Sequence, residues 1–476
     1  MKNKFRKLLR AVLPILLSAL FLLGSAPYAG AASPKTTTIR VGLRYASNGT
    51  DASSAYLINY VGHGFHFGYF DSSRNFVQYP VDTAVNVSSL DIVVSGSKIT
   101  VKDRTTSQVL YETNGDTERS LAVMPIPGPG EKCVTWFGTT KYYGAFEFTA
   151  LSSGYMQVVN VLDIDDYLKG VVPEEMMPYW PLEALKAQAM CARNYVVTHI
   201  NAHGSFDVCN TTCCQVYGGL TKANSQTDAA VDQTSGLYVR YNGAICETYY
   251  HATNGGATES SGNIWMTQLP YLVGRIDEYD TTVDTGFNSW SYTYSAAEIT
   301  DILNSKGYPI GTVKTVTPTY TPTGNIYSIT FSDGKVSHTI SKSEARSILY
   351  SSKYGKYTYS QHFRIISTSG SPTGLYINNG GNPLNDINSV YAVGGKGETS
   401  KVASSGGSVS VLTGSGLKTV DASGSGVPQT GTSFIVTGSG WGHNVGMSQY
   451  GAKAMAMAGK TFEEIIKYYF NGVTIG

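Results

Sequence analysis

Two adjacent glutamates, Glu174 and Glu175, stand in a proline-rich segment that directly precedes a helical pattern. A carboxylic acid can protonate a leaving oxygen and, once ionised, accept a proton back, which is general acid–base catalysis. Neighbouring side chains point in different directions along a strand or a helix, so only one of the pair is expected to face a shared pocket. The simpler interpretation is that both are solvated turn residues.

The elements around the glutamates are expected to hold a carboxylate rigidly. Three prolines stiffen the turn predicted for residues 171–181, and Pro181 suits the first position of a helix. Asp163 resembles a helix start, and the short helix that follows it is predicted to end near residues 169–170. After the turn, apolar residues recur at three- and four-residue spacing, which predicts a helix with one apolar face: Leu182, Leu185, Ala189, Ala192 and Val196. A turn between two helices gives a general acid the fixed mounting that it needs.

Four soft ligands follow within twelve residues: His203, Cys209, Cys213 and Cys214. One histidine with three cysteines is a known ligand set for structural zinc. A disulfide is an alternative in an exported protein, although adjacent Cys213 and Cys214 would pair with each other only in strained geometry. Free thiols are the third alternative. A zinc ion with four protein ligands has no open position for water, so it would be structural, and no cofactor is required for catalysis. A metallohydrolase is disfavoured, because three thiolates leave little Lewis acidity.

Two glycine-containing segments further along could approach a ligand with their backbone. Residues 249–258 have the pattern of a strand that enters a loop, and Gly255 with Gly256 allows close approach. Residues 440–446 are predicted to form a loop with positive φ angles, a conformation that Asn444 tolerates.

Composition indicates a β-rich α+β fold. The 52 glycines and 34 tyrosines imply many turns and many aromatic strand residues. Short alternating runs predict a small β accessory domain over residues 33–125, joined by a Pro-Gly-rich segment to a catalytic domain over residues 130–476. That domain is expected to form a β-rich core with a few helices packed around a substrate groove, and residues 367–431 to be a Gly/Ser-rich insertion. Helices are expected at residues 295–305, 342–349 and 448–458, and after a capping box formed by Thr461 and Glu464.

The N-terminus has the layout of an export signal over residues 1–32. Five basic residues precede an apolar run at 11–23 and then small residues, as in a secretory signal peptide. The run is shorter than the about 20 residues of a membrane span, so cleavage near Ala31 or Ala32 is predicted, with an uncleaved anchor as the alternative. Either way, the working part is expected to be secreted or in the cell wall. The net charge of +1 argues against a broad basic surface for nucleic acid.

From residue 142 onward the chain resembles the stage II sporulation protein D family (SpoIID/LytB type). Many blocks in the same order carry this resemblance: residues 142–144, 159–160, 166–168, 172–176, 183–189, 192–195, 215–217, 250–251, 254–256 and 440–452.

The resemblance implies what the protein does and where. Sporulation-type members are lytic transglycosylases that act on peptidoglycan glycan strands, and others are described as enhancers of cell-wall amidases. The family's catalytic carboxylate is the glutamate directly before the methionine, here Glu175, whereas Glu174 departs from the small residue usual at its position. The blocks that match the family, together with Lys186 on the face of Arg193, give the expected substrate contacts: Lys186, Arg193, Gln215, Tyr217, His251, Gly255, Gly256, Trp441, His443, Gln449 and Tyr450. His443 is the second candidate for acid–base chemistry. Some members bind zinc near the position of the His203 cluster.

One carboxylate suffices for this reaction, whereas hydrolytic glycosidases usually need two. Glu175, with a pKa raised by partial burial, is expected to protonate the oxygen that joins N-acetylmuramic acid to N-acetylglucosamine. Its carboxylate then deprotonates the C6 hydroxyl of the muramyl residue, which closes a 1,6-anhydro ring. The alternative is a non-catalytic protein that binds glycan and stimulates a partner amidase.

Overall fold

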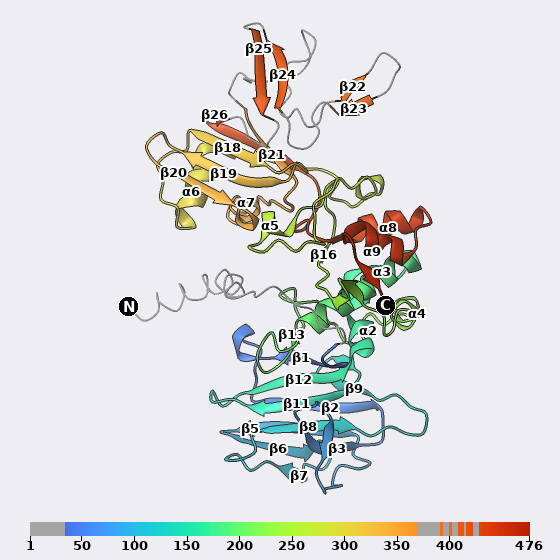
Figure 1. The fold of residues 1–476 in the computed structure, drawn as a ribbon. Helices are drawn as coiled ribbons and strands as arrows, with labels where there is room; N and C mark the ends of the chain where they lie inside the picture. The colour runs from blue at the N-terminus through green and yellow to red at the C-terminus, as the bar shows by residue number, and fades with distance from the viewer. Residues whose placement is uncertain (1–33, 369–390, 394–398, 402–407, 414–415, 422–427) are drawn as a thin grey trace. The chain divides into compact units, whose positions relative to one another are not determined.

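The computed structural model describes residues 34–368, 391–393, 399–401, 408–413, 416–421 and 428–476 (Figure 1). The export signal predicted for residues 1–32 and parts of the 367–431 insertion lie outside these ranges. Two compact units make up the chain. The N-terminal unit comprises Gly30–Tyr249, Met455–Tyr468 and Gly472–Gly476, and the C-terminal unit comprises Tyr250–Ala454 and Tyr469–Asn471. The chain combines strands with helices, and strands predominate, which confirms the predicted β-rich α+β class.

Two large sheets build the N-terminal unit. Their strand orders are β13-β1-β12-β11-β8-β3-β4 and β10-β9-β2-β5-β6-β7. Buried and less buried residues alternate in β5 and β6, as the short alternating runs of this segment predicted. The elements are β1 (Thr38–Arg44), η1 (Ala46–Asn48), β2 (Ser54–Val61), β3 (Phe65–Phe70), β4 (Phe76–Gln78), β5 (Ser89–Ser95), β6 (Lys98–Asp103), β7 (Val109–Glu112), β8 (Ser120–Pro125), β9 (Val134–Phe137), β10 (Thr140–Tyr142), β11 (Ala145–Ala150), β12 (Met156–Asp163) and β13 (Val208–Cys209).

The boundary expected at residues 125–130 does not separate these strands. β8, from the predicted accessory domain, pairs with β11, and β2 pairs with β9. The β8–β11 pair places Val123 opposite Phe146 and Leu121 opposite Phe148, and all four side chains are fully buried. Burial of these apolar side chains against each other favours one continuous core over two separate ones. The strands of residues 34–125 therefore share both sheets with the segment that leads into the glutamate pair.

Most of α9 (Phe462–Tyr469) belongs to the N-terminal unit, and three further helices and a small sheet complete it. They are α2 (Ile164–Glu175), α3 (Leu182–Thr198), α4 (Ser225–Asp232) and the sheet of β14 (Val239–Tyr241), β15 (Ala244–Ile245) and β29 (Thr474–Ile475). Asp163 caps α2 as predicted, since its side chain accepts the N–H of Asp165.

The helix expected to end near residues 169–170 is longer than the sequence suggested. It continues through Pro173 to Glu175, so the glutamates lie in a helical turn and not in the predicted proline-stiffened turn. The N–H of Met176 donates to the carbonyl of Val172 at 2.9 Å, so the helical hydrogen bonding resumes after the proline. Pro181 is the N-cap of α3 rather than its first residue.

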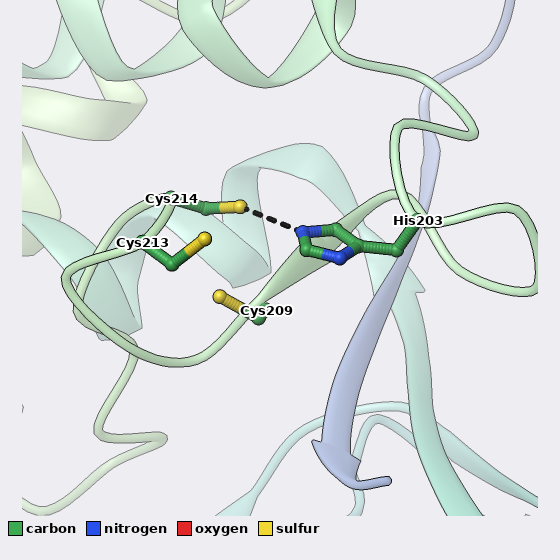
Figure 2. A group of neighbouring side chains, drawn as sticks. All are labelled: His203, Cys209, Cys213 and Cys214. Atoms are coloured by element: carbon green, nitrogen blue, oxygen red, sulfur yellow. Dashed lines mark hydrogen bonds between the residues drawn. The ribbon is translucent and has the colours of Figure 1, made fainter. Parts of the chain in front are cut away.

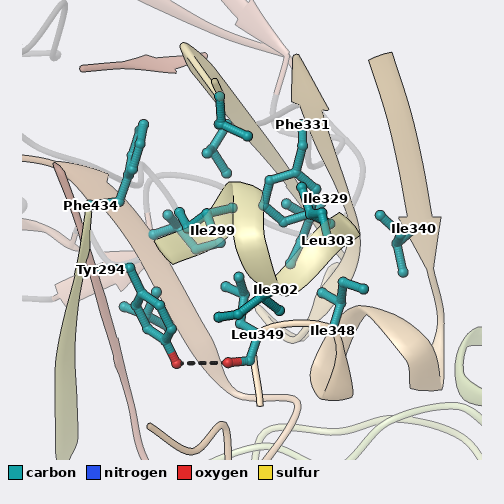
Figure 3. Close-up of a cluster of buried hydrophobic side chains, with 14 of the residues drawn as sticks. Tyr294, Ile299, Ile302, Leu303, Ile329, Phe331, Ile340, Ile348, Leu349 and Phe434 are labelled. Atoms are coloured by element: carbon teal, nitrogen blue, oxygen red, sulfur yellow. Dashed lines mark hydrogen bonds between the residues drawn. The ribbon is translucent and has the colours of Figure 1, made fainter. Parts of the chain in front are cut away.

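The C-terminal unit has its own hydrophobic core. Two sheets, β17-β27-β21 and β20-β19-β18-β26, contribute to it together with α6. In the core shown in Figure 3, Leu303 of α6 lies beside Ile329, whereas Ile299 lies on the side of the helix towards Phe434 and Tyr294. The predicted helix begins with a capping box of Ser295 and Glu298.

The remaining elements of the described chain are short. They are β16 (Tyr250–His251), α5 (Ser261–Ile264), η2 (Asp280–Thr282), β17 (Trp290–Ser295), α6 (Ala296–Ser305), β18 (Thr315–Tyr320), β19 (Ile326–Ser332), β20 (Ser337–Ser341), α7 (Ser343–Ser347), β21 (Phe363–Ser367), β22 (Tyr391–Val393), β23 (Thr399–Lys401), β24 (Ser408–Thr413), β25 (Gly416–Asp421), β26 (Gln429–Thr430), β27 (Ser433–Gly438), β28 (Met447–Ser448), α8 (Gln449–Met457) and α9 (Phe462–Tyr469). Within the described ranges, no helix is both long enough and apolar enough to cross a bilayer.

Candidate functional site

The two glutamates at the end of α2 have different surroundings. Glu174 Oε2 lies 2.6 Å from Nζ of Lys222, and its side chain packs so closely on Gly218 that a Cβ there would collide with it. Glu175, the next residue, projects about 100° further around the helix and is partly buried. The ion pair therefore engages one carboxylate of the pair in a structural contact.

The segment after Glu175 is anchored at both ends and exposed between them. Met176 and Trp180 are buried, whereas Tyr179 is 78% exposed and Met177 is also exposed. The glutamate is thus followed by an apolar, aromatic surface held by two buried side chains.

Arg193 lies inside the N-terminal unit rather than on a surface. Its side chain is fully buried, and Nη2 lies 2.8 Å from Asp165 Oδ1 at the start of α2. It also donates to Thr234 Oγ1 and to the carbonyl of Val231 at the end of α4. These contacts tie three helices together, which is a structural arrangement.

Lys186 shares a helix with Arg193 but has a different environment. Its Nζ lies 2.7 Å from Glu183 Oε1 on the same helix and 5.8 Å from the ring centroid of Phe462. The predicted common face therefore holds one buried and one partly exposed cation.

His203, Cys209, Cys213 and Cys214 converge, as their spacing suggested (Figure 2). One ligand atom from each lies within 4.8 Å of the others. His203 Nε2 lies 3.1 Å from Cys214 Sγ, and its ring stacks on Phe206 at 4.7 Å. Hydrogen bonds from Cys214 and His203 lower the pKa of Cys209 to about 3, whereas the Cys209 contact and burial raise the pKa of Cys214.

This donor set fits a zinc ion. Tetrahedral coordination at about 2.3 Å places sulfur atoms about 3.8 Å apart, which the cluster reaches with a small contraction. Neighbouring thiolates repel one another, and a divalent cation would neutralise that repulsion. The four residues can thus hold one metal in a closed structural site.

The loop that follows the cluster packs along α2. Gln215 accepts a hydrogen bond from the Tyr167 hydroxyl at 3.1 Å, and Tyr217 lies against Gly170, where a Cβ would collide with its ring. The N–H of Gly218 donates to the carbonyl of Gly170 at 3.2 Å. Gln215 and Tyr217 are both buried and support the helix that ends in Glu175.

The C-terminal unit brings a second set of predicted residues together. Thr253 bridges to Trp441, β16 pairs with β28, and Asn444 donates to the carbonyls of Asn254 and Ala257. Asn444 has the predicted positive φ, 64°. Gly255 and Gly256, at φ 70° and 117°, allow the close approach of these two segments.

Two histidines of this set lie side by side. The rings of His251 and His443 are 5.4 Å apart, and Trp265 contacts His443 at 5.3 Å. Burial lowers the pKa of His251 to about 4 and lowers that of His443 as well. Both rings are therefore neutral near pH 7.

Trp441, Gln449 and Tyr450 occupy different positions around the histidines. Trp441 is half exposed and packs on Phe287 at 4.5 Å. Gln449 is buried, and the N–H of Tyr450 donates to the carbonyl of Ala252. Of these three side chains, that of Trp441 offers the most exposed ring surface for a ligand.

Sequence reasoning missed a buried carboxylate that fixes both segments. Asp280 accepts from Thr253 Oγ1 at 2.6 Å, from Gly255 N–H at 2.9 Å and from the Ser448 hydroxyl. Burial raises its pKa. No motif marks this aspartate, because its partners lie 25 to 168 residues away in sequence.

Comparison with known proteins identifies a family for the segment that contains the glutamate pair and the His203 cluster. The family model described as Stage II sporulation protein (SpoIID) matches residues 152–241, which contain the glutamate pair and the His–Cys cluster. An uncharacterized protein of Brachyspira hyodysenteriae is 33% identical over 341 residues, covering 70% of this chain and 72% of that protein.

Two relatives from Bacillus subtilis have descriptive names. Its amidase enhancer is 31% identical over 327 residues, covering 65% of this chain but only 40% of the enhancer. Its stage II sporulation protein D is 27% identical over 337 residues, covering 67% of this chain and 76% of that protein. With these matches and the order of motifs along it, the chain belongs to the stage II sporulation protein D family.

Proposed function

We propose that this protein is an exported peptidoglycan lytic transglycosylase that uses Glu175 as its single general acid and base. Family membership and the names of the relatives support a cell-wall-related role. Glycan strands are the substrate in this proposal, and the cleaved bond joins N-acetylmuramic acid to N-acetylglucosamine.

In this reaction one proton leaves Glu175 and another, from the substrate, returns to it. Glu175 protonates the glycosidic oxygen as its bond to the muramyl C1 breaks. The resulting carboxylate removes the proton from the C6 hydroxyl, whose oxygen bonds to C1 and closes the 1,6-anhydro ring. Water is not consumed, and the glutamate returns to its protonated state.

The observation that carries the choice of acid is the ion pair of Glu174 with Lys222 at 2.6 Å. This contact and the close packing on Gly218 give the Glu174 carboxylate a structural role. Glu175 follows it at the end of α2 and holds the position directly before Met176 that matches the family's catalytic residue.

The test is mass spectrometry of glycan fragments after incubation with the protein. Wild type and Glu174→Gln are expected to release fragments that end in 1,6-anhydro-muramic acid, and Glu175→Gln to release none. Both variants replace a helical glutamate by its neutral isostere, so each controls for the fold of the other. Reducing ends would contradict the transglycosylase reaction, and activity of Glu175→Gln would contradict the assignment.

The second candidate function is glycan binding that stimulates a cell-wall amidase. The match to a protein named amidase enhancer favours it. In this case the purified protein leaves glycan strands intact but increases the release of stem peptides by an added amidase, and Glu175→Gln does so equally well.

We also propose that the His203 cluster holds one structural zinc. Its residues would coordinate the ion, and its contribution is to fix the loop of Gln215 and Tyr217 against α2. This supports the position of Glu175 without the metal touching substrate.

A further inference from the structure

A row of aromatic rings runs through the C-terminal unit from Trp441. The ring centroids of Trp441 and Tyr359 are 6.0 Å apart, those of Tyr359 and Tyr357 are 5.9 Å apart, and those of Tyr357 and Tyr350 are 5.2 Å apart. We call these four residues the aromatic row. None of the three tyrosines belongs to a sequence motif of the predicted site.

Two tyrosines of the row, Tyr357 and Tyr359, lie on the same face of their segment. Burial alternates along residues 357–360, so their side chains point in turn to two faces. Thr358 and Ser360 are buried and donate to the carbonyls of Arg346 and Ser439, whereas Tyr357 and Tyr359 lie on the opposite, partly exposed face.

The row is continuous with the segment that carries Trp441. Ser360 bridges to Gly442, and the N–H of Gly442 donates to the carbonyl of Tyr359 at 3.0 Å. Two further aromatic residues contact the row. Phe287 packs on Trp441 at 4.5 Å, and the hydroxyls of Tyr292 and Tyr359 are 3.3 Å apart.

Both ends of the row are open to solvent. Trp441 is 49% exposed and Tyr350 is 47% exposed. Neighbouring ring planes along the row are inclined by 62°, 34° and 61°. The half-exposed end rings therefore present aromatic surface on which a ligand can stack.

The cations beside the row are engaged within the unit. Lys306 Nζ donates to the carbonyl of Tyr350 at 3.0 Å, and Arg346 Nη1 donates to that of Tyr359 at 3.4 Å. Lys353 pairs with Asp301 and Lys356 with Glu298, each at 2.7 Å. Rings and hydroxyls without an added charge match a ligand that combines apolar faces with hydroxyl edges. Sugar rings have this character, whereas an anionic polymer such as a polyphosphate requires arginine or lysine side chains.

We propose that the aromatic row is a glycan-binding surface, which stacks the faces of successive sugar rings. The ligand class is a β-linked N-acetylhexosamine strand. This inference deepens the proposed function in its choice of substrate, but it makes its own claim about binding.

The test uses oligomers of N-acetylglucosamine, from dimer to hexamer, because they lack muramic acid and their binding can be measured without the cleavage proposed above. Dissociation constants are measured by calorimetry for wild type, Tyr350→Ala and Tyr357→Ala. Tyr327→Ala is the matched control, because Tyr327 is 37% exposed on β19 of the same unit but lies outside the row.

The row variants are expected to bind the hexamer about two- to tenfold more weakly, the range for loss of one aromatic contact. The dimer, too short to occupy the whole row, should lose less affinity, and Tyr350→Phe should bind like wild type because the ring is retained. Unchanged hexamer binding in Tyr350→Ala and Tyr357→Ala overturns the inference, as does an equal loss in Tyr327→Ala or the absence of hexamer binding by wild type. If binding depends on the row but no strand is cleaved, the enzymatic proposal fails and this one stands.

Discussion

The rings of His251 and His443 form hydrogen bonds with the two backbone polar groups of a single residue, Val445. His251 Nδ1 contacts the carbonyl of Val445 at 3.2 Å, and the N–H of Val445 donates to His443 Nδ1 at 3.1 Å. A carbonyl only accepts and an N–H only donates, so His251 carries its proton on Nδ1 whereas His443 carries its own on Nε2. The backbone of Val445 thus fixes opposite tautomers in two neighbouring rings.

The first prediction concerns stability at acid pH. Burial holds the pKa of His251 at about 4, whereas an unfolded histidine titrates near 6.5. The unfolded state therefore binds more protons between these values, and stability is full above pH 6.5 and falls as the pH drops towards 4. This group alone is expected to lower the free energy of unfolding by about 2 kcal/mol between pH 7 and pH 5. His443, whose pKa is also lowered, acts in the same direction.

Urea unfolding at the two pH values measures this difference. His251→Gln should show a smaller loss between pH 7 and pH 5 than wild type, and His63→Gln should match wild type, since His63 is an exposed histidine of the other unit. Equal pH dependence in His251→Gln and wild type would show that the ring is not held neutral by the fold.

The second prediction tests whether Arg193 has a structural role or binds the ligand. Arg193→Met leaves Asp165 without its buried partner, and breaking such a pair costs about 3–5 kcal/mol of stability. Thermal unfolding should show this loss, whereas Lys222→Met, which removes an exposed cation, should change stability little. A stable Arg193→Met protein with weakened glycan binding would instead support the substrate contact expected from the sequence.

The third prediction concerns the metal. Elemental analysis is expected to find one zinc per chain in the wild type and none in Cys209→Ser, while Cys133→Ser, a cysteine outside the cluster, retains it. Removal of the zinc by a chelator should lower the thermal stability of the protein and also its glycan cleavage, because the loop of Gln215 no longer supports α2. Re-addition of zinc should restore both.

Two results would contradict this prediction. A mass lower than that of the reduced chain by two hydrogen atoms, with two further thiols appearing only after reduction, would identify a disulfide. Loss of cleavage without loss of stability would point to a metal that takes part in the reaction.

Local signals in the sequence predicted local structure well. Ser295 with Glu298 and Thr461 with Glu464 form helix starts whose hydrogen bonds lie within four residues, and both occur. The positive φ of Asn444 follows from the glycines around it. The same holds for the His203 cluster, because close spacing alone brings its four residues near one another.

Features that depend on distant partners were missed or misjudged. The pairing of β8 with β11 across the predicted domain boundary has no local signal. Pro173 suggested a turn, but buried contacts of α2 outweigh the one hydrogen bond that a proline removes. Arg193 looked like a surface cation on a helix face, and only the fold supplies Asp165 as its buried partner.

The fourth prediction addresses Asp280, which no local pattern identified. Its two oxygens accept hydrogen bonds from Thr253, Gly255 and Ser448, so every partner is a donor. Asp280→Asn turns one acceptor into a donor and leaves at least one buried N–H or hydroxyl unsatisfied, which costs about 1–3 kcal/mol. Because these partners belong to the segments of His251 and Gln449, hydrogen exchange should accelerate at residues 253–256 and 447–449. Asp284→Asn is the control, since Asp284 is an exposed aspartate of the same unit. Unchanged exchange in Asp280→Asn would mean that the paired backbones hold the two segments without the carboxylate.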